Sequence, residues 1–364
     1  MSNLAKLPGL IDPHVHLREP GATQKEDFET GTKAAIAGGY TLVLDMPNNP
    51  IATVSPQALQ EKMDLAKGRI YCDVGFHFGA SSKSVQYFEE VAGKVFGLKV
   101  YMNQTTGDLL MEDDQTLEAV FSSWPKDKQS LPFAVAKRKP ILVHAEGDTL
   151  QKAISLAKKF NNKLHVCHVS LEKEIELIKE AKKGGLRVSC EVTCHHLFLT
   201  EEDEKRLGPF GVMRPPLTSK KDQEALWQGI VDGTIDMIAS DHAPHTKEEK
   251  LNSEKPINGI PGLETSLPLL LTAFSEGRLT MNKLIEITSV NPRKIFDLPE
   301  QEDTYVEVDT EESYILENDN LQTKCGWTPF AGMKVTGRVK SVVLRGQQVF
   351  DGKNVLGPFG QLLP

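Results

Sequence analysis

Short apolar runs of β-strand character recur along the chain, and segments of helical character separate most of them. The eight runs cover residues 10–16, 40–46, 71–78, 96–102, 140–144, 163–169, 187–193 and 235–240. Apolar residues at spacings of three and four, with charges between them, fill the segments 25–37, 57–66, 149–160, 172–183 and 221–231. Strands that alternate with helices indicate parallel βαβ units, and eight such units predict a closed (β/α)8 barrel of the TIM type. A doubly wound open sheet is the alternative, but the chain contains no Gly-rich dinucleotide or P-loop motif to support one.

The 364-residue chain is longer than a barrel of about 250 residues requires. Beyond the last run, residues 263–274 and 281–288 have helical spacing, and Asn291-Pro292-Arg293 is expected to break it. Residues 300–313 are acidic and strand-like, and residues 335–344 and 347–350 predict a hairpin that turns at Gly346. We therefore expect a barrel over residues 8–297 and a small accessory β layer over residues 298–364.

Charge and composition exclude several classes of partner. The net charge is −8 and no basic block occurs, which argues against nucleic acid. No apolar run approaches the roughly 20 residues that cross a bilayer, so no membrane association is expected. Five cysteines without a CxxC pair, and an N-terminus unlike a signal peptide, predict reduced thiols and a cytoplasmic location. Because the first predicted strand begins near residue 10, one alternative is that the chain is a domain of a longer polypeptide.

Several predicted strands end in side chains that bind metals. His14 and His16 end the first, His144 the fifth and His168 the sixth, and Asp241 follows the eighth. Alternation along a strand points His14 and His16 to one side, and barrel strands all end on one face. Each histidine alone is more often structural, but together with Asp241 they predict a Zn²⁺ site. Because they exceed what one tetrahedral ion needs, two metals are favoured.

Lys99 lies in the fourth predicted strand and raises a question of charge. Two metals about 3.5–4 Å apart need a bridging anion, and they would repel an ammonium group. A neutral lysine amine that reacts with CO₂ becomes a carbamate, whose two oxygens can bridge two ions. The alternative is that Lys99 points outward and is solvated, as most lysines are.

The chain resembles the amidohydrolase superfamily and, within it, the dihydroorotases, especially the dihydroorotase domains of animal multifunctional pyrimidine proteins. The motifs that carry the resemblance are LPGLIDPHVHLREPG (7–21), MPNN (46–49), GLK (97–99), HAE (144–146), HVCH (165–168), CEV (190–192), SDHAPH (240–245) and PGLE (261–264). They extend over nearly the whole chain, to WTPF (327–330). The histidine pair alone is shared by many amidohydrolases, whereas the segments HLREPG, MPN and SDHAPH together are much more specific.

The resemblance implies roles for individual residues. One Zn²⁺ would be held by His14, His16, carboxylated Lys99 and Asp241, and the other by Lys99, His144 and His168. Arg18, Asn48 and His245 would hold the substrate α-carboxylate, for which the guanidinium fork is suited. The implied reaction is the reversible cyclisation of N-carbamoyl-L-aspartate to L-dihydroorotate in pyrimidine biosynthesis, with Asp241 as the proton carrier.

Other residues near the predicted mouth have two interpretations each. Arg214 contacts either the substrate or a neighbouring loop. Thr105 and Thr106 lie where the family has a mobile loop, and Thr106 stands where an aromatic residue is expected. Thr106 either forms a hydrogen bond with substrate or belongs to a polar surface loop. Cys167 and Glu191 either hold a third Zn²⁺ or are a buried thiol and a hydrogen-bonded carboxylate.

Two rival functions are kept beside the zinc dihydroorotase. A dihydropyrimidinase or hydantoinase would use the same metals, but an Arg18–Asn48 carboxylate clamp has no purpose on an uncharged ring. A noncatalytic scaffold barrel is the other rival, and it would be expected to have lost metal ligands. The family also suggests a homodimer.

Overall fold

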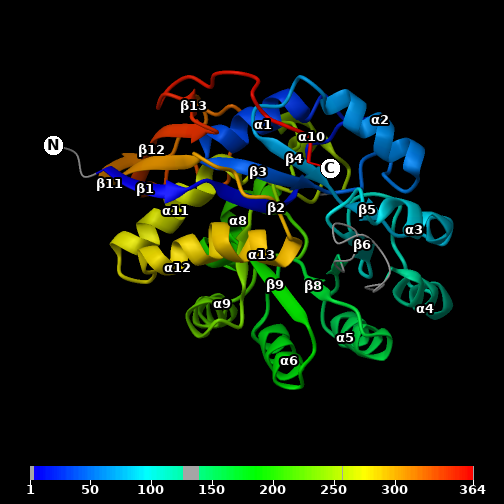
Figure 1. The fold of residues 1–364 in the computed structure, drawn as a ribbon. Coiled ribbons are helices and arrows are strands. Elements are labelled where there is room, and N and C mark those ends of the chain that lie inside the picture. The colour runs from blue at the N-terminus through cyan, green and yellow to red at the C-terminus, as the bar shows by residue number, and fades with distance from the viewer. Residues whose placement is uncertain (1–3, 126–138, 256, 364) are drawn as a thin grey trace.

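The computed structural model describes residues 4–125, 139–255 and 257–363, and its centre is a closed ring of parallel strands (Figure 1). The strands of the ring are β2 (Leu10–Val15), β3 (Tyr40–Asp45), β4 (Asp73–Phe76), β5 (Phe78–Gly79), β6 (Leu98–Tyr101), β7 (Ile141–His144), β8 (Leu164–Val166), β9 (Val188–Thr193) and β10 (Met237–Ala239). β2, β3 and β4 pair in order, and β5 to β10 pair in order. His77 interrupts one predicted strand, so β4 and β5 together correspond to the third predicted run. A parallel bridge between Val15 and His242, next to β10, closes the ring. The predicted barrel is confirmed.

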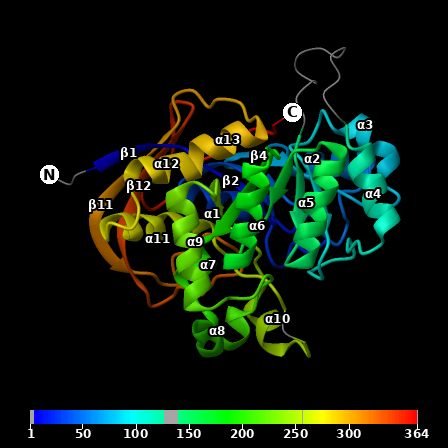
Figure 2. The same cartoon turned by 90° about the horizontal axis from the view of Figure 1, so that it is seen from below.

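Helices cover the outside of the ring, and Figure 2 shows α5, α6 and α9 side by side. The helices are α1 (Phe28–Ala37), α2 (Pro56–Ala66), α3 (Phe88–Val91), α4 (Asp114–Ser123), α5 (Asp148–Phe160), α6 (Glu172–Lys183), α7 (Cys194–Phe198), α8 (Glu201–Leu207), α9 (Lys220–Asp232), α10 (Lys247–Asn252), α11 (Leu263–Ser275), α12 (Met281–Ile285) and α13 (Asn291–Phe296). Short 3₁₀ segments are η1 (Val85–Tyr87) and η2 (Gly208–Gly211), and η3 (Glu286–Val290) is a π-helical turn. Asp27, Ser55 and Ser219 accept backbone hydrogen bonds that begin α1, α2 and α9.

One helix boundary was predicted wrongly. Asn291-Pro292-Arg293 does not break the helical pattern, because α13 begins at Asn291 directly after η3. Pro292 occupies the first turn of α13, where a backbone N–H has no partner within the helix to lose.

An antiparallel accessory sheet packs on the barrel, and its strand order is β1-β11-β12-β13. Its C-terminal strands β11 (Tyr305–Ile315), β12 (Lys334–Leu344) and β13 (Gln347–Phe350) confirm the predicted accessory layer. The sequence did not suggest β1 (Leu4–Pro8), which pairs with β11 and leads through Gly9 into β2. At the other end of the chain, Leu362 bridges to Val74 of β4. A domain division between residues 297 and 298 stays a prediction.

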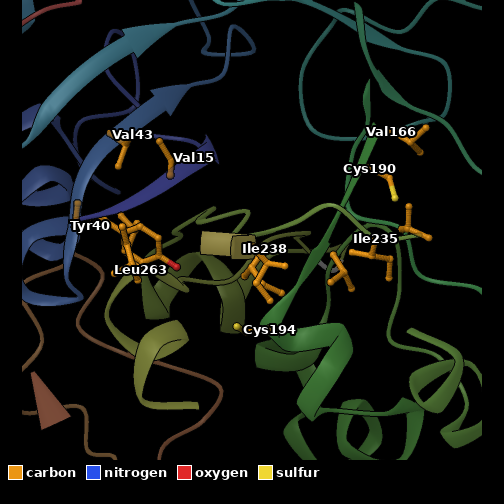
Figure 3. Close-up of a cluster of buried hydrophobic side chains, with 14 of the residues drawn as sticks. Val15, Tyr40, Val43, Val166, Cys190, Cys194, Ile235, Ile238 and Leu263 are labelled. Atoms are coloured by element: carbon orange, nitrogen blue, oxygen red, sulfur yellow. The ribbon is translucent and has the colours of Figure 1, made fainter. Parts of the chain in front are cut away.

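Alternate residues of the barrel strands enter two separate apolar clusters. Leu10, Val43 and Ile238 belong to the large cluster that also contains helix residues, and Figure 3 shows Tyr40 of β3 beside Leu263 of α11. Their strand neighbours Ile11, Leu42, Leu44 and Met237 belong to a smaller cluster with Phe296 of α13. The first set therefore faces the helices and the second fills the ring.

Phe296 lies inside the ring, in the smaller apolar cluster. Its ring centroid lies 5.7 Å from that of His77 and 5.2 Å from that of His165.

Within the described ranges, no helix is long and apolar enough to cross a membrane.

The close contact between β12 and α11 yields a stability prediction. At Gly337 the φ angle is +108°, and an added Cβ would lie 2.4 Å from Cβ of Leu271. Gly337→Ala should therefore lower the free energy of unfolding by about 2–4 kcal/mol, through backbone strain and overpacking together. The measurement is the denaturation midpoint.

Gly346→Ala is the matched control, because Gly346 has a φ of +74° but nothing within 4 Å of an added Cβ. It should lose only the left-handed backbone cost of about 1–2 kcal/mol. Equal losses in the two variants would contradict a close sheet–helix approach.

Candidate metal centre

His14, His16 and Asp241 converge where the ring closes. His14 lies in β2, His16 follows β2, and Asp241 follows β10. The Oδ1 atom of Asp241 lies 3.3 Å from Nε2 of His14 and 3.1 Å from Nε2 of His16. One ligand atom from each of the three residues lies within 4.8 Å of the others. Two imidazoles and a carboxylate facing one point are a donor set that fits a Zn²⁺ ion.

A second pair of imidazoles faces the same interior. Nδ1 of His144 lies 2.9 Å from Nε2 of His168, and the ring of His168 lies 5.4 Å from that of His14. Of the two remaining ring nitrogens, Nδ1 of His168 is buried without a hydrogen-bond partner, and Nε2 of His144 lies 3.6 Å from Oε1 of Glu146. Buried polar atoms without partners are uncommon in folded proteins. The two nitrogens that face each other, Nδ1 of His144 and Nε2 of His168, fit a cation bound by both rings.

Lys99 points inward from β6 and is fully buried. Its ammonium donates a hydrogen bond to Sγ of Cys167 at 2.9 Å. Among the residues that the structure describes, no carboxylate forms an ion pair with Lys99. The outward, solvated alternative is therefore wrong, because the Lys99 side chain is buried. A buried ammonium without a counter-charge is also costly.

Cys167 and Glu191 lie behind His14, away from the cavity. Ligand atoms of His14, Cys167 and Glu191 lie within 4.8 Å of one another. Glu191 contacts Nδ1 of His14 through Oε1, and its Oε2 lies 2.9 Å from Nε2 of His165. This geometry accommodates both interpretations of the pair: a further metal site, or a carboxylate that orients the His14 ring.

Three site residues have left-handed backbone conformations that are unfavourable for residues with a Cβ. The φ angles are +63° at Arg18, +34° at His168 and +46° at Asp241. Such strain costs about 1–3 kcal/mol per residue and persists where surrounding structure enforces it. At all three positions the chain leaves a strand and turns its side chain toward the cavity.

Burial and neighbouring charges set the pKa values of the histidines and of Asp241. Burial lowers the pKa of His16 to about 3 and that of His168 well below its usual value, so both rings are neutral, as metal ligands must be. Burial and Lys99 also disfavour a charged His14, but Glu191 and Asp241 outweigh them and raise its pKa to about 10. Burial disfavours an ionised Asp241, yet His14 and His16 hold the pKa of that carboxyl below its usual range.

A cavity of about 400 Å³, including space open to solvent, lies above the ligands. Of the predicted substrate residues, Arg18, Asn48, Thr105, Thr106 and Arg214 line it. His245 does not line it, and instead its Nε2 lies 3.1 Å from Nη2 of Arg18. The nearby Thr106 carbonyl accepts a hydrogen bond from the Asn48 amide at 3.0 Å.

Sequence reasoning missed four lining residues: Tyr101, Ala243, Asn258 and Gly259. Tyr101 could have been found, because it lies two residues after Lys99 in β6 and so faces the same side. Its hydroxyl is buried and has no hydrogen-bond partner. Asn258 and Gly259 lie in an irregular loop, where periodicity gives no signal.

Comparisons with known proteins agree with this geometry. Residues 5–349 match the model of the amidohydrolase family. The chain is 48% identical over 360 residues to the multifunctional protein CAD of Squalus acanthias, covering 98% of this chain but only 15% of that protein. It is 36% identical to a dihydroorotase of Pyrococcus furiosus, covering 96% of this chain and 83% of that one.

Two solved structures share the fold. An L-hydantoinase (dihydropyrimidinase) of Arthrobacter aurescens superposes with a TM-score of 0.90 at 26% identity, covering 99% of this chain and 88% of that one. An inactive dihydroorotase-like domain of a Chaetomium thermophilum CAD-like multifunctional protein gives 0.80 at 29% identity, covering 98% of both chains.

The protein belongs to the amidohydrolase family. Within that family, its sequence relatives include dihydroorotases that stand alone and multifunctional proteins several times its length.

Proposed function

We propose that this protein is a zinc-dependent dihydroorotase, which interconverts N-carbamoyl-L-aspartate and L-dihydroorotate. The observation that carries the proposal is that Arg18 and Asn48 line the same cavity as His14, His16 and Asp241. A guanidinium and an amide beside a metal centre suit a cyclic amide that also bears a carboxylate. Similarity to dihydroorotases supports the same substrate.

In the proposed centre, His14, His16 and Asp241 would hold one Zn²⁺, and His144 and His168 would hold the other. Lys99, as a carbamate, would supply an anionic ligand to the centre. The burial of Lys99 without a carboxylate partner among the described residues supports this assignment, because carbamate formation replaces the ammonium with an anion. When bound, the ions polarise a carbonyl oxygen and lower the pKa of water.

The protein's own residues then bind the substrate and move one proton. Arg18 and Asn48 hold the α-carboxylate, while His245 contacts the guanidinium of Arg18 and orients it. In the hydrolytic direction, a water oxygen attacks the ring amide carbon, and the carbon–nitrogen bond breaks. Asp241 accepts the proton from that water and delivers it to the leaving nitrogen. Cyclisation runs in reverse, with Asp241 removing the ureido proton as water is lost.

A hydantoinase or dihydropyrimidinase is the second candidate, favoured by the backbone similarity to the Arthrobacter enzyme. Its substrates have no exocyclic carboxylate that would need Arg18. The third candidate is a noncatalytic barrel, since a close structural neighbour is described as inactive. The buried metal-binding set argues against that candidate, because a scaffold has no need of it.

Substrate choice separates these candidates. The purified protein should hydrolyse dihydroorotate and leave dihydrouracil essentially untouched. Arg18→Met should raise KM for dihydroorotate by about 10- to 100-fold, since a hydrogen bond to a charged group contributes about 1.5–3 kcal/mol. Steady-state kinetics with both compounds measure this.

Arg206→Met is the control, because Arg206 lies on the surface in α8 and pairs with Asp203 at 3.0 Å. Its kinetics should match those of the unaltered protein. Turnover of dihydrouracil alone would favour a dihydropyrimidinase, and turnover of neither compound would favour a scaffold.

Lys99 gives a test of the proposed bridge. The native mass should include two or three zinc ions and the added mass of one CO₂, and the CO₂ mass should be absent in Lys99→Ala. That variant should be inactive, and a small added carboxylate should restore part of the activity by occupying the place of the carbamate. Full activity in Lys99→Ala without an additive would contradict the bridging role.

We also propose that Cys167 and Glu191, beside His168, hold a third Zn²⁺. Cys167→Ser should then reduce the zinc content by one equivalent in native mass spectrometry. Cys190→Ser is the matched control, because Cys190 is equally buried in β9 but bonds to the Thr234 carbonyl. Two zincs in both variants and in the unaltered protein would favour an orienting role for Glu191.

A homodimer, a cytoplasmic location and membership of a larger multifunctional polypeptide stay predictions. The chain spans 15% of the CAD relative and 83% of the Pyrococcus relative, so relatives of both kinds are compatible with it.

A further inference from the structure

A fully buried ion pair joins the end of β3 to α2. Nζ of Lys62, in α2, is 2.5 Å from Oδ2 of Asp45, at the end of β3, and both side chains are 0% exposed. Neither residue lines the cavity, and neither belongs to the proposed metal centre. A buried charge pair carries a desolvation cost that its mutual attraction often only offsets. Burial accordingly raises the pKa of Asp45 and lowers that of Lys62.

Lys62 holds the loop that carries Asn48. Besides the ion pair, its ammonium donates to the carbonyl of Met46 at 2.9 Å and to Oδ1 of Asn49 at 2.8 Å. These two partners lie on either side of Asn48 in the sequence. The ammonium thus donates two hydrogen bonds to the loop, while its charge is paired with Asp45. Lys62 therefore holds this loop on both sides of Asn48.

Asp45 holds the loop that carries Arg18. Its Oδ1 accepts a hydrogen bond from the backbone N–H of Leu17 at 2.8 Å. Leu17 lies between the metal-site residue His16 and Arg18, whose φ is +63°. The carboxylate thus anchors the chain immediately before the strained residue that turns the guanidinium into the cavity.

We propose that Lys62 and Asp45 are positioning residues that set the separation of Arg18 and Asn48, and so shape the carboxylate clamp. The pair joins the loops that follow the neighbouring strands β2 and β3, and these loops carry Arg18 and Asn48. The inference deepens the proposed function and rests on it, since a clamp needs a substrate carboxylate.

The same pair also supports the cavity rim. Asn48, fixed by Lys62, donates from its amide to the carbonyl of Thr106 at 3.0 Å. A Cβ added at Gly107 would be 3.4 Å from the carbonyl oxygen of Asn48. The segment from Thr105 to Gly107 therefore sits on a loop whose position depends on the ion pair.

The test is the double variant Asp45→Asn with Lys62→Met. Asparagine keeps an acceptor for the Leu17 N–H, and methionine fills a similar volume without charge. KM for dihydroorotate should rise at least about tenfold with a much smaller change in kcat, because binding of the ground state and transition state weakens alike. Zinc content should not change.

Two further measurements separate positioning from general destabilisation. Hydrogen exchange at the amides of residues 17–18 and 46–49 should become faster in the double variant. Adding Arg18→Met to the double variant should raise KM by much less than it does alone, because both changes disable one clamp.

The control is Lys179→Met with Asp232→Asn, an exposed pair 2.6 Å apart on α6 and α9. It should leave KM, exchange and zinc content unchanged. If the buried double variant does not fold, Asn49→Ala decides, because it removes only one hold of Lys62 on the loop. That variant should raise KM by about threefold.

The outcomes distinguish the two proposals. Turnover of dihydroorotate by the unaltered protein, with KM unchanged in Asn49→Ala and in any folded double variant, would overturn the positioning role and leave the function standing. No turnover by the unaltered protein would reject the function. Hydrogen exchange would then show whether the pair orders both loops, and unchanged exchange would reject that too.

Discussion

Closure of the strand ring is the constraint on which the rest of the structure depends. The bridge between Val15 and His242, reinforced by the His16 N–H donating to the His242 carbonyl at 2.8 Å, joins the first strand to the last. It brings His16 and Asp241, 225 positions apart in the sequence, to 3.1 Å. A pairing of that sequence separation carries a large loop-closure entropy, so the site forms only when the whole barrel has formed.

The closed ring also determines the electrostatics of its interior. The His14 ring contacts Glu191 through one nitrogen and lies beside Asp241 with the other. Lys99 has the thiol of Cys167 as its hydrogen-bond partner. Phe296 packs against His77 and His165 inside the ring, and apolar surroundings of this kind strengthen nearby charge interactions. Imidazoles and carboxylates gathered in this way offer electron pairs that cations can bind, which agrees with the proposed dinuclear centre.

The sequence predicted the barrel because each strand is a short apolar run between helices with clear periodicity. It predicted that the candidate ligands lie close together, because all strands of a barrel end on one face. It could not predict β1, since the five residues before Gly9 do not reveal that β11, about 300 positions away, is their partner. Pro292 was misread because a proline that ends a helix and one that begins a helix look alike in isolation. Lys62 did leave a signal: Leu59, Lys62 and Ala66 form the buried stripe of α2, and a lysine there demands a buried partner.

The left-handed backbone at Arg18, His168 and Asp241 has a consequence for engineering. Glycine or asparagine at these positions would relieve the strain, so selection for heat resistance alone would favour them. Each such exchange would remove a guanidinium, an imidazole or a carboxylate from the cavity. Improvement of durability and retention of chemistry therefore pull in opposite directions at these three positions, and a screen for one has to monitor the other.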